Sequence, residues 1–176
     1  PERTRRNKQG DFVLRYPLYL RWWIYGEKRP ALYATIAGME RVITIAATSR
    51  TLAFTFADSR NVFSHATYVI AHDTIAHMGI LQSVFHESWA REYSSSMKGD
   101  LRYTPTDSYD HFPFTTAMAA LTDSCEMYFR HRQEVMQNRG RGLTQTYNLF
   151  HNAGDLSQDV VKLRNLHVAM DQAVAA

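Results

Sequence analysis

The sequence of 176 residues contains a single cysteine, Cys125. One thiol cannot form an internal disulfide, and it cannot supply the ligands of a cysteine-based zinc site. This usage fits a reducing compartment such as the cytoplasm. Because Cys125 falls on the apolar stripe of a predicted helix, we expect its thiol to be buried in the core.

The sequence also lacks the short motifs of several enzyme classes. It has no glycine-rich phosphate loop, no GxGxxG pattern, no GxSxG elbow and no Asn/Asp-Pro-Pro-Tyr/Phe motif. No apolar run approaches the length of a membrane span, and no signal-peptide core follows the basic start. No internal repeat or low-complexity tract is present. We therefore expect no membrane association.

The composition is that of an ordinary globular chain. Hydrophobic residues make up 45% and charged residues 21%, so the chain suits one domain or two small ones. The formal net charge of +3 and the isoelectric point near 9.1 are mildly basic. Such a charge permits an anionic partner without requiring one.

The N-terminal segment begins at Pro1 rather than Met and is basic and polar. We expect this end to be a cut inside a longer polypeptide. Residues 1–19 are predicted to form a basic linker, because blocks of like charge are usually solvated.

Two helices are predicted ahead of any strand. Leu18, Trp22 and Tyr25 recur at helical spacing within residues 17–26, and Gly26 suits a C-cap. Pro30 favours the first turn of a second helix, which is predicted to reach about residue 37.

After Arg41 the apolar period changes from 3.6 toward 2. Strands are predicted at residues 42–45, 51–56 and 67–71, with a polar turn at 48–50 forming the tip of a hairpin. Short strands joined by polar turns indicate a small, mainly antiparallel sheet.

The rest of the chain is mostly helical by its periodicity. Asp73 is predicted to cap a helix over residues 73–95. Its apolar stripe is Ile75, Met78, Leu81, Phe85 and Trp89. A loop is predicted from Gly99 to Phe114, followed by helices over residues 115–138 and 143–150. The buried face of the first of these is Met118, Leu121, Cys125, Tyr128 and Val135.

A last helix is predicted after an Asp155–Gln158 capping box. Its stripe is Leu156, Val160, Leu163, Met170 and Val174. The predicted fold class is therefore α+β, in which a small, mainly antiparallel sheet packs with helices and an all-helical C-terminal part follows.

Histidines offer two candidate patterns for chemistry. The set His65, His72, Asp73 and Asp100 is compatible with a metal-dependent phosphohydrolase, whose ligands must converge on one ion. The role of Asp73 as a helix cap explains the His72–Asp73 pair more simply. His86 lies beside the apolar stripe, and we expect it to be a buried histidine with its own hydrogen-bond partner rather than a catalytic group.

Basic residues form several groups along the chain. They are Arg21, Lys28 and Arg29; Arg50; Arg102; and Arg130, Arg132, Arg139 and Arg141. Phosphate binding needs such cations on one face, and a guanidinium at a hairpin tip is suited to a guanine edge in the major groove. Composition alone favours the simpler interpretation, in which these are solvated surface cations.

An ordered series of segments resembles one known family. These are WW (22–23), RPALYATIAGMERVI (29–43), TSRTLAF (48–54), LQSVFHESWARE (81–92), DLRYTPTDSYDHFPF (100–114), GLTQTYNLFH (142–151) and LRNLHVAMDQAV (163–174). The family is the C-terminal target recognition and helical region of MmeI-type adenine-specific DNA methyltransferases, which include restriction-modification enzymes. The resemblance covers nearly the whole chain, and its most specific segment is RYTP…FPF.

The resemblance implies a target recognition domain at residues 20–114 and a helical C-terminal domain at residues 115–176. The partners it implies are double-stranded DNA and an upstream methyltransferase domain of the same polypeptide, in the cytoplasm of a bacterium or archaeon. That upstream domain would bind S-adenosylmethionine and flip an adenine. The resemblance thus implies no cofactor, no metal and no catalytic residue in these 176 residues.

The resemblance also implies DNA contacts. Ser49, Arg50, Thr51 and Leu52 match the segment that approaches base edges, and Arg50 would favour guanine. Leu52 departs from the polar reader expected there, so it would pack or touch a thymine methyl group. Backbone contacts are expected from Arg21, Lys28, Arg29, Arg102 and Tyr103.

Two alternatives to DNA recognition stay open at this stage. One is the metal-dependent hydrolase built on the His72–Asp73 pair. The other is a protein-interaction module whose basic face is incidental.

Overall fold

The computed structural model describes residues 4–14, 16–21, 28–97, 99–115 and 118–176. These residues form two units, residues 1–37 and residues 38–176. In the first unit, helix α1 (Pro30–Ile36) begins at the proline, as predicted. Of the predicted helix over residues 17–26, residues 17–21 are described and form a turn rather than a helix, whereas residues 22–26, with Trp22 and Trp23, lie outside the described residues.

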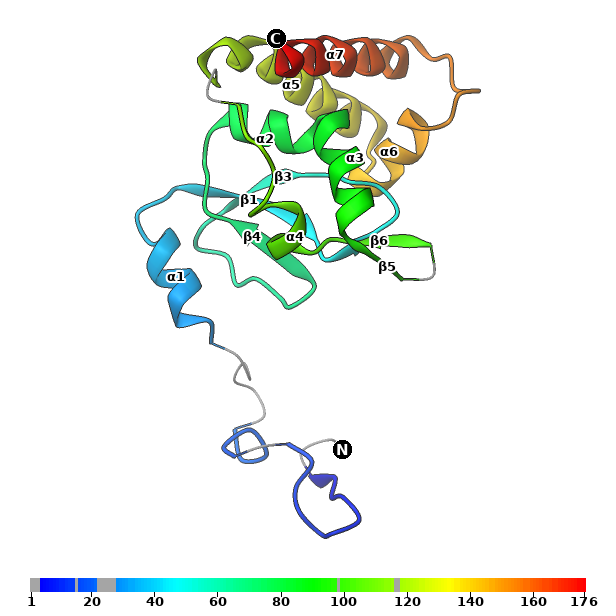
Figure 1. The fold of residues 1–176 in the computed structure, drawn as a ribbon. Helices are drawn as coiled ribbons and strands as arrows, with labels where there is room; N and C mark the ends of the chain where they lie inside the picture. The colour runs from blue at the N-terminus through cyan, green and yellow to red at the C-terminus, as the bar shows by residue number, and fades with distance from the viewer. Residues whose placement is uncertain (1–3, 15, 22–27, 98, 116–117) are drawn as a thin grey trace. The chain divides into compact units, whose positions relative to one another are not determined.

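The first sheet of the second unit has strand β1 (Arg41–Ala46) at its centre (Figure 1). Strands β3 (Thr55–Asp58) and β4 (Thr67–Ile70) pair with it in antiparallel register, so Ile43 lies opposite both Phe56 and Ile70. The predicted strands at 42–45 and 67–71 are confirmed. The strand predicted at 51–56 is shorter, because residues 51–54 leave the ladder and their backbone groups bind side chains instead.

The second sheet was not foreseen. Strand β6 (Asp100–Arg102) lies between β2 (Thr48–Ser49) and β5 (Ser95–Met97), and both pairings are antiparallel. The turn predicted at 48–50 and the uninterrupted loop predicted from Gly99 to Phe114 are therefore wrong. A strand of two residues is stabilised by a partner about fifty positions away, and local periodicity carries no sign of that pairing. A further short helix, α4 (Pro105–Ser108), follows β6.

The helix predicted over residues 73–95 is broken in two by Ser83. Helix α2 (Ile75–Gln82) ends where the Ser83 hydroxyl donates to the Ile80 carbonyl at 2.7 Å. The same hydroxyl oxygen accepts from the His86 N–H at 3.4 Å and caps helix α3 (Val84–Tyr93). Ser83 is extended, with φ −65° and ψ 157°, so the two helices have different axes.

The break moves the apolar stripe. Met78 and Leu81 are buried as predicted, but Phe85 on α3 is 45% exposed, and His86 and Ala90 are buried in its place. The predicted cap is also displaced by one residue, because the side chain of Thr74, not Asp73, accepts from the His77 N–H.

The C-terminal part consists of a short 3₁₀ turn, η2 (Met118–Leu121), and three helices. These are α5 (Thr122–Arg139), α6 (Leu143–Phe150) and α7 (Gln158–Ala175). Leu121, Cys125, Tyr128 and Val135 are buried, as their spacing predicted. Leu156 was wrongly placed on the last stripe: it is 78% exposed, because α7 starts two residues later. None of the described helices combines the length and apolar character needed to span a bilayer.

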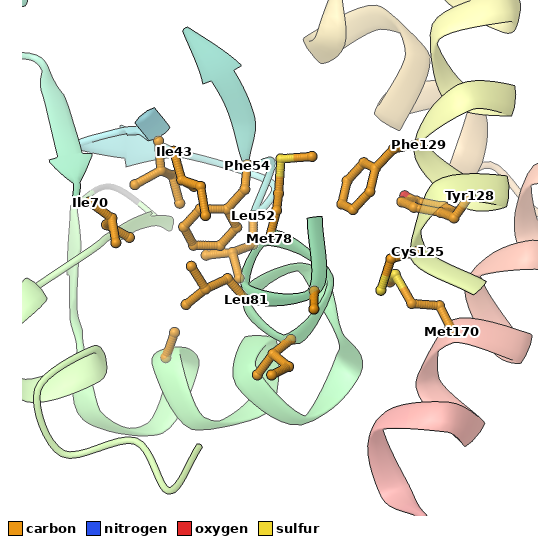
Figure 2. Packing of buried hydrophobic residues seen from close by; sticks show 14 of the residues in the cluster. Ile43, Leu52, Phe54, Ile70, Met78, Leu81, Cys125, Tyr128, Phe129 and Met170 are labelled. Atoms are coloured by element: carbon orange, nitrogen blue, oxygen red, sulfur yellow. The ribbon is translucent and has the colours of Figure 1, made fainter. Parts of the chain in front are cut away.

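One hydrophobic core joins the first sheet to the C-terminal helices. Helix α2 lies between them, and Figure 2 shows Met78 and Leu81 between the sheet residues and the side chains of Cys125 and Phe129. Met170 of α7 completes this side of the core. The core thus crosses position 114, where the predicted domain boundary falls.

Helix α2 approaches α5 closely because residue 79 is glycine. A Cβ atom on Gly79 would lie 2.1 Å from the Cys125 Sγ and 3.2 Å from its Cβ. The first distance is shorter than real Cβ contacts and the second is tighter than most of them, so a larger residue here requires Cys125 or one of the two helices to shift.

The side-chain amide of Gln82 fixes the segment between β1 and β3. We call residues 47–54 the connecting segment. The Gln82 Nε2 donates to the Leu52 carbonyl at 2.8 Å, and its Oε1 accepts from the Phe54 N–H at 3.0 Å. Gln82 is 2% exposed, so both backbone groups would be buried and unpaired without it. The amide thereby supplies the hydrogen bonds that a neighbouring strand would otherwise provide.

Replacement of Gly79 by alanine should destabilise the fold by about 1–3 kcal/mol, as overpacked cores do. At a solvent-exposed position of a helix, replacement of glycine by alanine stabilises the protein instead. The free energy of unfolding from urea titration measures this, with Gly38→Ala as the control, because nothing lies within 4 Å of a Cβ there. The double variant with Cys125→Ala should recover part of the loss. Strict additivity of the two losses would contradict the close contact.

Replacement of Gln82 by methionine should cost about 2–6 kcal/mol. Methionine fills a similar volume but leaves the Phe54 N–H and the Leu52 carbonyl unpaired, at about 1–3 kcal/mol each. The exposed Gln145 provides the matched control, Gln145→Met, which should change stability little. Equal unfolding free energies for the two variants would show that Gln82 does not hold the connecting segment.

Candidate nucleic-acid interface

One face of the second sheet carries an exposed polar row. Thr48 lies opposite Arg102, and Arg102 lies opposite Ser95. Directly paired residues project to the same face of a sheet, so these three side chains form one line, which we call the outer row. All three are exposed. The next row contains Ser49 and the buried Leu101, and it faces the other way.

Arg50 follows β2 directly and is held by its backbone rather than by its side chain. Its carbonyl accepts a hydrogen bond from the Arg91 Nη2 at 3.3 Å. Arg91 is itself fixed by Glu87, with Nε and Nη2 at 2.9 Å and 2.6 Å from the carboxylate Oε1. Within the described residues, no hydrogen bond or ion pair engages the Arg50 guanidinium. The structure thus positions the backbone and leaves the cationic group open to an external partner.

The end of α6 adds a histidine to this region. Burial lowers the pKa of His151 from its usual value. The Glu87 carboxylate acts to raise this pKa, and the positive charges of Arg91 and Arg50 act to lower it further. Glu87, Arg91 and Arg50 therefore lie in the surroundings of His151, and the lowered pKa favours its neutral ring.

A pocket opens beside Arg102. It is lined by Tyr68, Tyr93, Ser94, Ser95, Arg102, Tyr103, Thr104 and Asp107. Tyr93 is 53% exposed, so its ring is accessible from solvent. A guanidinium, hydroxyl groups and an aromatic ring are the side-chain types that contact phosphates and sugars in nucleic-acid complexes.

Two of the residues predicted to contact DNA are core residues. Leu52 is 2% exposed and belongs to the hydrophobic core, where the Gln82 bond to its carbonyl holds it. Tyr103 is 1% exposed, and its hydroxyl lies 3.0 Å from the His86 Nε2. Both side chains point inward because the backbone of each is tied to a neighbouring element. Leu52 thus packs in the core, which is one of the two roles expected for it, whereas the burial of Tyr103 is at odds with its predicted contact to a nucleic acid.

The pair formed by His86 and Tyr103 confirms that His86 is a buried, hydrogen-bonded histidine. Burial lowers the pKa of His86 to about 4 and raises the pKa of Tyr103. Both groups are therefore neutral at pH 7. They anchor β6 to α3 and have no access to a reaction partner.

The remaining predicted contacts differ in their accessibility. Thr51 is 9% exposed, and its N–H donates to the Ser49 Oγ at 3.4 Å. Arg50 is therefore the one exposed side chain among residues 49, 50, 51 and 52, Ser49 being half-buried. Arg21, Lys28 and Arg29 belong to the unit of residues 1–37.

The residues proposed for a metal site do not converge. Among the described residues, no group of three or more His, Cys, Asp or Glu side chains is arranged to hold an ion. The ring of His72 instead stacks on that of His77, with centroids 3.9 Å apart. The hydrolase hypothesis therefore finds no support in this geometry.

Arg91 and Gln82 are the important residues that sequence reasoning missed. Glu87 and Arg91 are four positions apart on a predicted helix, which is the spacing of an ion pair, so Arg91 could have been found. Gln82 carried no such signal, because its partners lie 28 and 30 positions away.

The second sheet with its outer row, and Arg50 beside it, belong to an α+β module that exposes the two arginines Arg50 and Arg102. The family model described as "MmeI, target recognition domain" matches residues 27–116, slightly more than half of the chain. The chain belongs to the MmeI target recognition domain family, which confirms the resemblance in the sequence.

A solved structure shows the same fold. It is that of MmeI, a Type IIL restriction-modification enzyme, in complex with DNA. The similarity has a TM-score of 0.62 and 19% sequence identity, and it covers 77% of this chain. The present chain spans 18% of that enzyme chain. A search of curated proteins gave no match.

The low pKa of His86 predicts a stability that depends on pH. In the unfolded chain, His86 has a pKa near 6.5 and is protonated below that pH. In the folded chain, it stays neutral until the pH falls to about 4. This contribution to stability is therefore complete above pH 6.5 and is lost as the pH falls toward 4, by about 3 kcal/mol. The difference in unfolding free energy between the wild type and His86→Gln should shrink by that amount between pH 7 and pH 4.

The control for this measurement is His65→Gln, because His65 is exposed on a turn. Its pH profile should run parallel to that of the wild type. A parallel profile for His86→Gln as well would show that burial does not hold His86 neutral.

Proposed function

We propose that this chain reads the sequence of double-stranded DNA as the target recognition region of a site-specific adenine-N6 DNA methyltransferase. The family match carries the proposal. The similar enzyme was solved with DNA, and the cationic surface around Arg50 and Arg102 suits the same partner. The proposal assigns double-stranded DNA as the ligand of the outer row and of Arg50.

Arg50 is the residue we assign to base readout. A guanidinium binds the O6 and N7 atoms of guanine in bidentate fashion, provided that its backbone is held at the right depth in the major groove. The Arg91 bond to its carbonyl, and the Gln82 bonds that follow at Leu52 and Phe54, supply that fixed position. Readout at this site would then depend on the one side chain at position 50.

The outer row is assigned to the DNA backbone. Arg102 supplies a positive charge, and Thr48 and Ser95 supply hydroxyl donors on the same face of the sheet. Contacts of this kind orient a protein on the duplex but do not discriminate between sequences. The pocket beside Arg102, with Tyr93 at its edge, extends the same surface. Backbone contacts from Arg21, Lys28 and Arg29 belong to the same proposal.

The chemistry of the whole protein would reside in another domain of the same polypeptide. That methyltransferase domain would bind S-adenosylmethionine and receive an adenine flipped out of the duplex. The chain described here would need no cofactor of its own. Such an enzyme would act in the cytoplasm of a bacterium or archaeon, as part of a restriction-modification system.

Variants at positions 50 and 102 should have different effects on DNA binding. Selection from a randomised duplex pool at low salt gives the preferred sequence, and titration gives its affinity. Arg50→Ala should reduce the preference at one base pair by about 10- to 100-fold, the value of one bidentate contact. Arg102→Ala should weaken all duplexes alike and reduce the slope of log K against log salt by about one.

Arg141→Gln is the charge-matched control, because Arg141 is exposed and lines none of the pockets described for this chain. It should keep the preferred sequence. An equal loss on every duplex for Arg50→Ala would make Arg50 a backbone contact. Failure of the wild-type chain to bind duplex DNA at low salt would favour a protein-interaction module instead.

A further inference from the structure

A cleft between the first sheet and α5 gathers three arginines. Arg41 comes from β1, and Arg130 and Arg132 come from α5. Thr55 and Gln133 contribute polar groups, and Glu126 is the one acidic side chain of the lining. We call this the arginine cleft. Its lining contains neither Arg50 nor a residue of the outer row, and it shares no residue with the pocket beside Arg102.

Arg132 is the most unusual member of the arginine cleft, because it is a cation with only 5% exposure. Its Nη1 donates to the Phe54 carbonyl at 2.9 Å and to the Tyr147 hydroxyl at 3.0 Å. Both acceptors are neutral. Within the described part of the chain, no carboxylate lies within 4.0 Å of its guanidinium. Its guanidinium also lies 4.7 Å from the centre of the Phe129 ring. A buried charge without a counterion is costly, so an external anion would stabilise this site.

Arg41 is held in place on the other side of the cleft. Its Nε donates to the Asp73 carbonyl at 2.9 Å, and its guanidinium lies 3.8 Å from the centre of the Phe56 ring. These contacts fix the plane of the guanidinium and engage only the Nε donor. The terminal nitrogens are left for another acceptor, again without a carboxylate partner among the described residues.

Arg130 precedes Arg132 by two residues on α5 and is exposed. Glu126 is four positions before it, but the two do not approach within ion-pair distance in this structure. The lining therefore carries three positive charges against one negative charge. Three guanidinium groups from two elements offer more donors than a carboxylate can accept, whereas a phosphate has several oxygens for them.

We propose that the arginine cleft binds a phosphate group, and that in the DNA complex this is a phosphate of the duplex backbone. The second statement rests on the proposed function. Arg41 and the connecting segment lie at opposite ends of β1, whose length is about 17 Å. About five base pairs of duplex cover that length. The cleft would thus hold the DNA several base pairs from the position that Arg50 reads.

The first test uses inorganic phosphate and the complete 176-residue chain. Thermal unfolding is followed as phosphate replaces chloride at constant ionic strength. Phosphate at ten times its dissociation constant should raise the Tm of the wild type by about 3–6 °C. Arg130→Gln and Arg41→Gln should lose most of this rise, and Arg141→Gln should keep it. An equal rise in all four proteins would overturn the proposal.

The second test decides the source of the phosphate. Duplex binding is titrated at several salt concentrations with Arg130→Gln, whose exposed side chain makes the change safe for folding. The slope of log K against log salt should fall by about one, and the preferred sequence should be unchanged. An unchanged slope, with the phosphate effect on Tm lost, would assign the cleft to free phosphate and overturn the DNA contact.

The two proposals fail separately. If the wild-type chain does not bind duplex DNA, the proposed function fails, while the thermal experiment still decides whether the arginine cleft holds phosphate. If DNA binds with its preference dependent on Arg50 but neither test responds to Arg130 and Arg41, the cleft proposal alone fails.

Discussion

The two hydrogen bonds from the Gln82 side chain are the interaction on which the presentation of Arg50 depends. They turn Leu52 and Phe54 into core residues although their backbone has left the sheet. Arg132 adds a third bond, to the Phe54 carbonyl. With Leu52 and Phe54 fixed in this way, and with the Arg50 carbonyl bound by Arg91, the backbone at Arg50 has little freedom to move. The buried amide thus links the packing of α2 to the surface chemistry of the module.

The helices and the central strand could be predicted from local sequence. Pro30 starts α1, the β-branched run at 42–45 forms β1, and the apolar spacing of Leu121, Cys125 and Tyr128 identifies the buried face of α5. Periodicity of this kind records burial along one element. The second sheet could not be found in the same way, since β2 has two residues and exists only through its pairing with β6. Ser83 could have been recognised as a helix cap from its residue type. The change of buried face from Phe85 to His86 and Ala90 could not, because it depends on the direction of the α3 axis.

The residues of the candidate site could likewise be predicted only where local sequence determines their exposure. Arg50 and Arg102 were identified from residue type and resemblance, and both are exposed. Leu52 and Tyr103 come from the same segments, yet they are buried, because alternation within a short strand or a clamped loop decides which neighbour faces outward. Arg132 shows the converse: a charged residue read as surface from the sequence is 5% exposed and bonded to Phe54. Contacts over long sequence distances determined each of these outcomes.

The central claim is that DNA lies on the face formed by the outer row and Arg50. Amide hydrogen exchange, measured by mass spectrometry on the 176-residue chain with and without saturating duplex DNA, tests it most directly. The account predicts slower exchange in the peptides that contain residues 48–50 and 95–102. It also predicts unchanged exchange in the C-terminal half of α7. Protection confined to α7, with residues 48–50 and 95–102 unaffected, would contradict it.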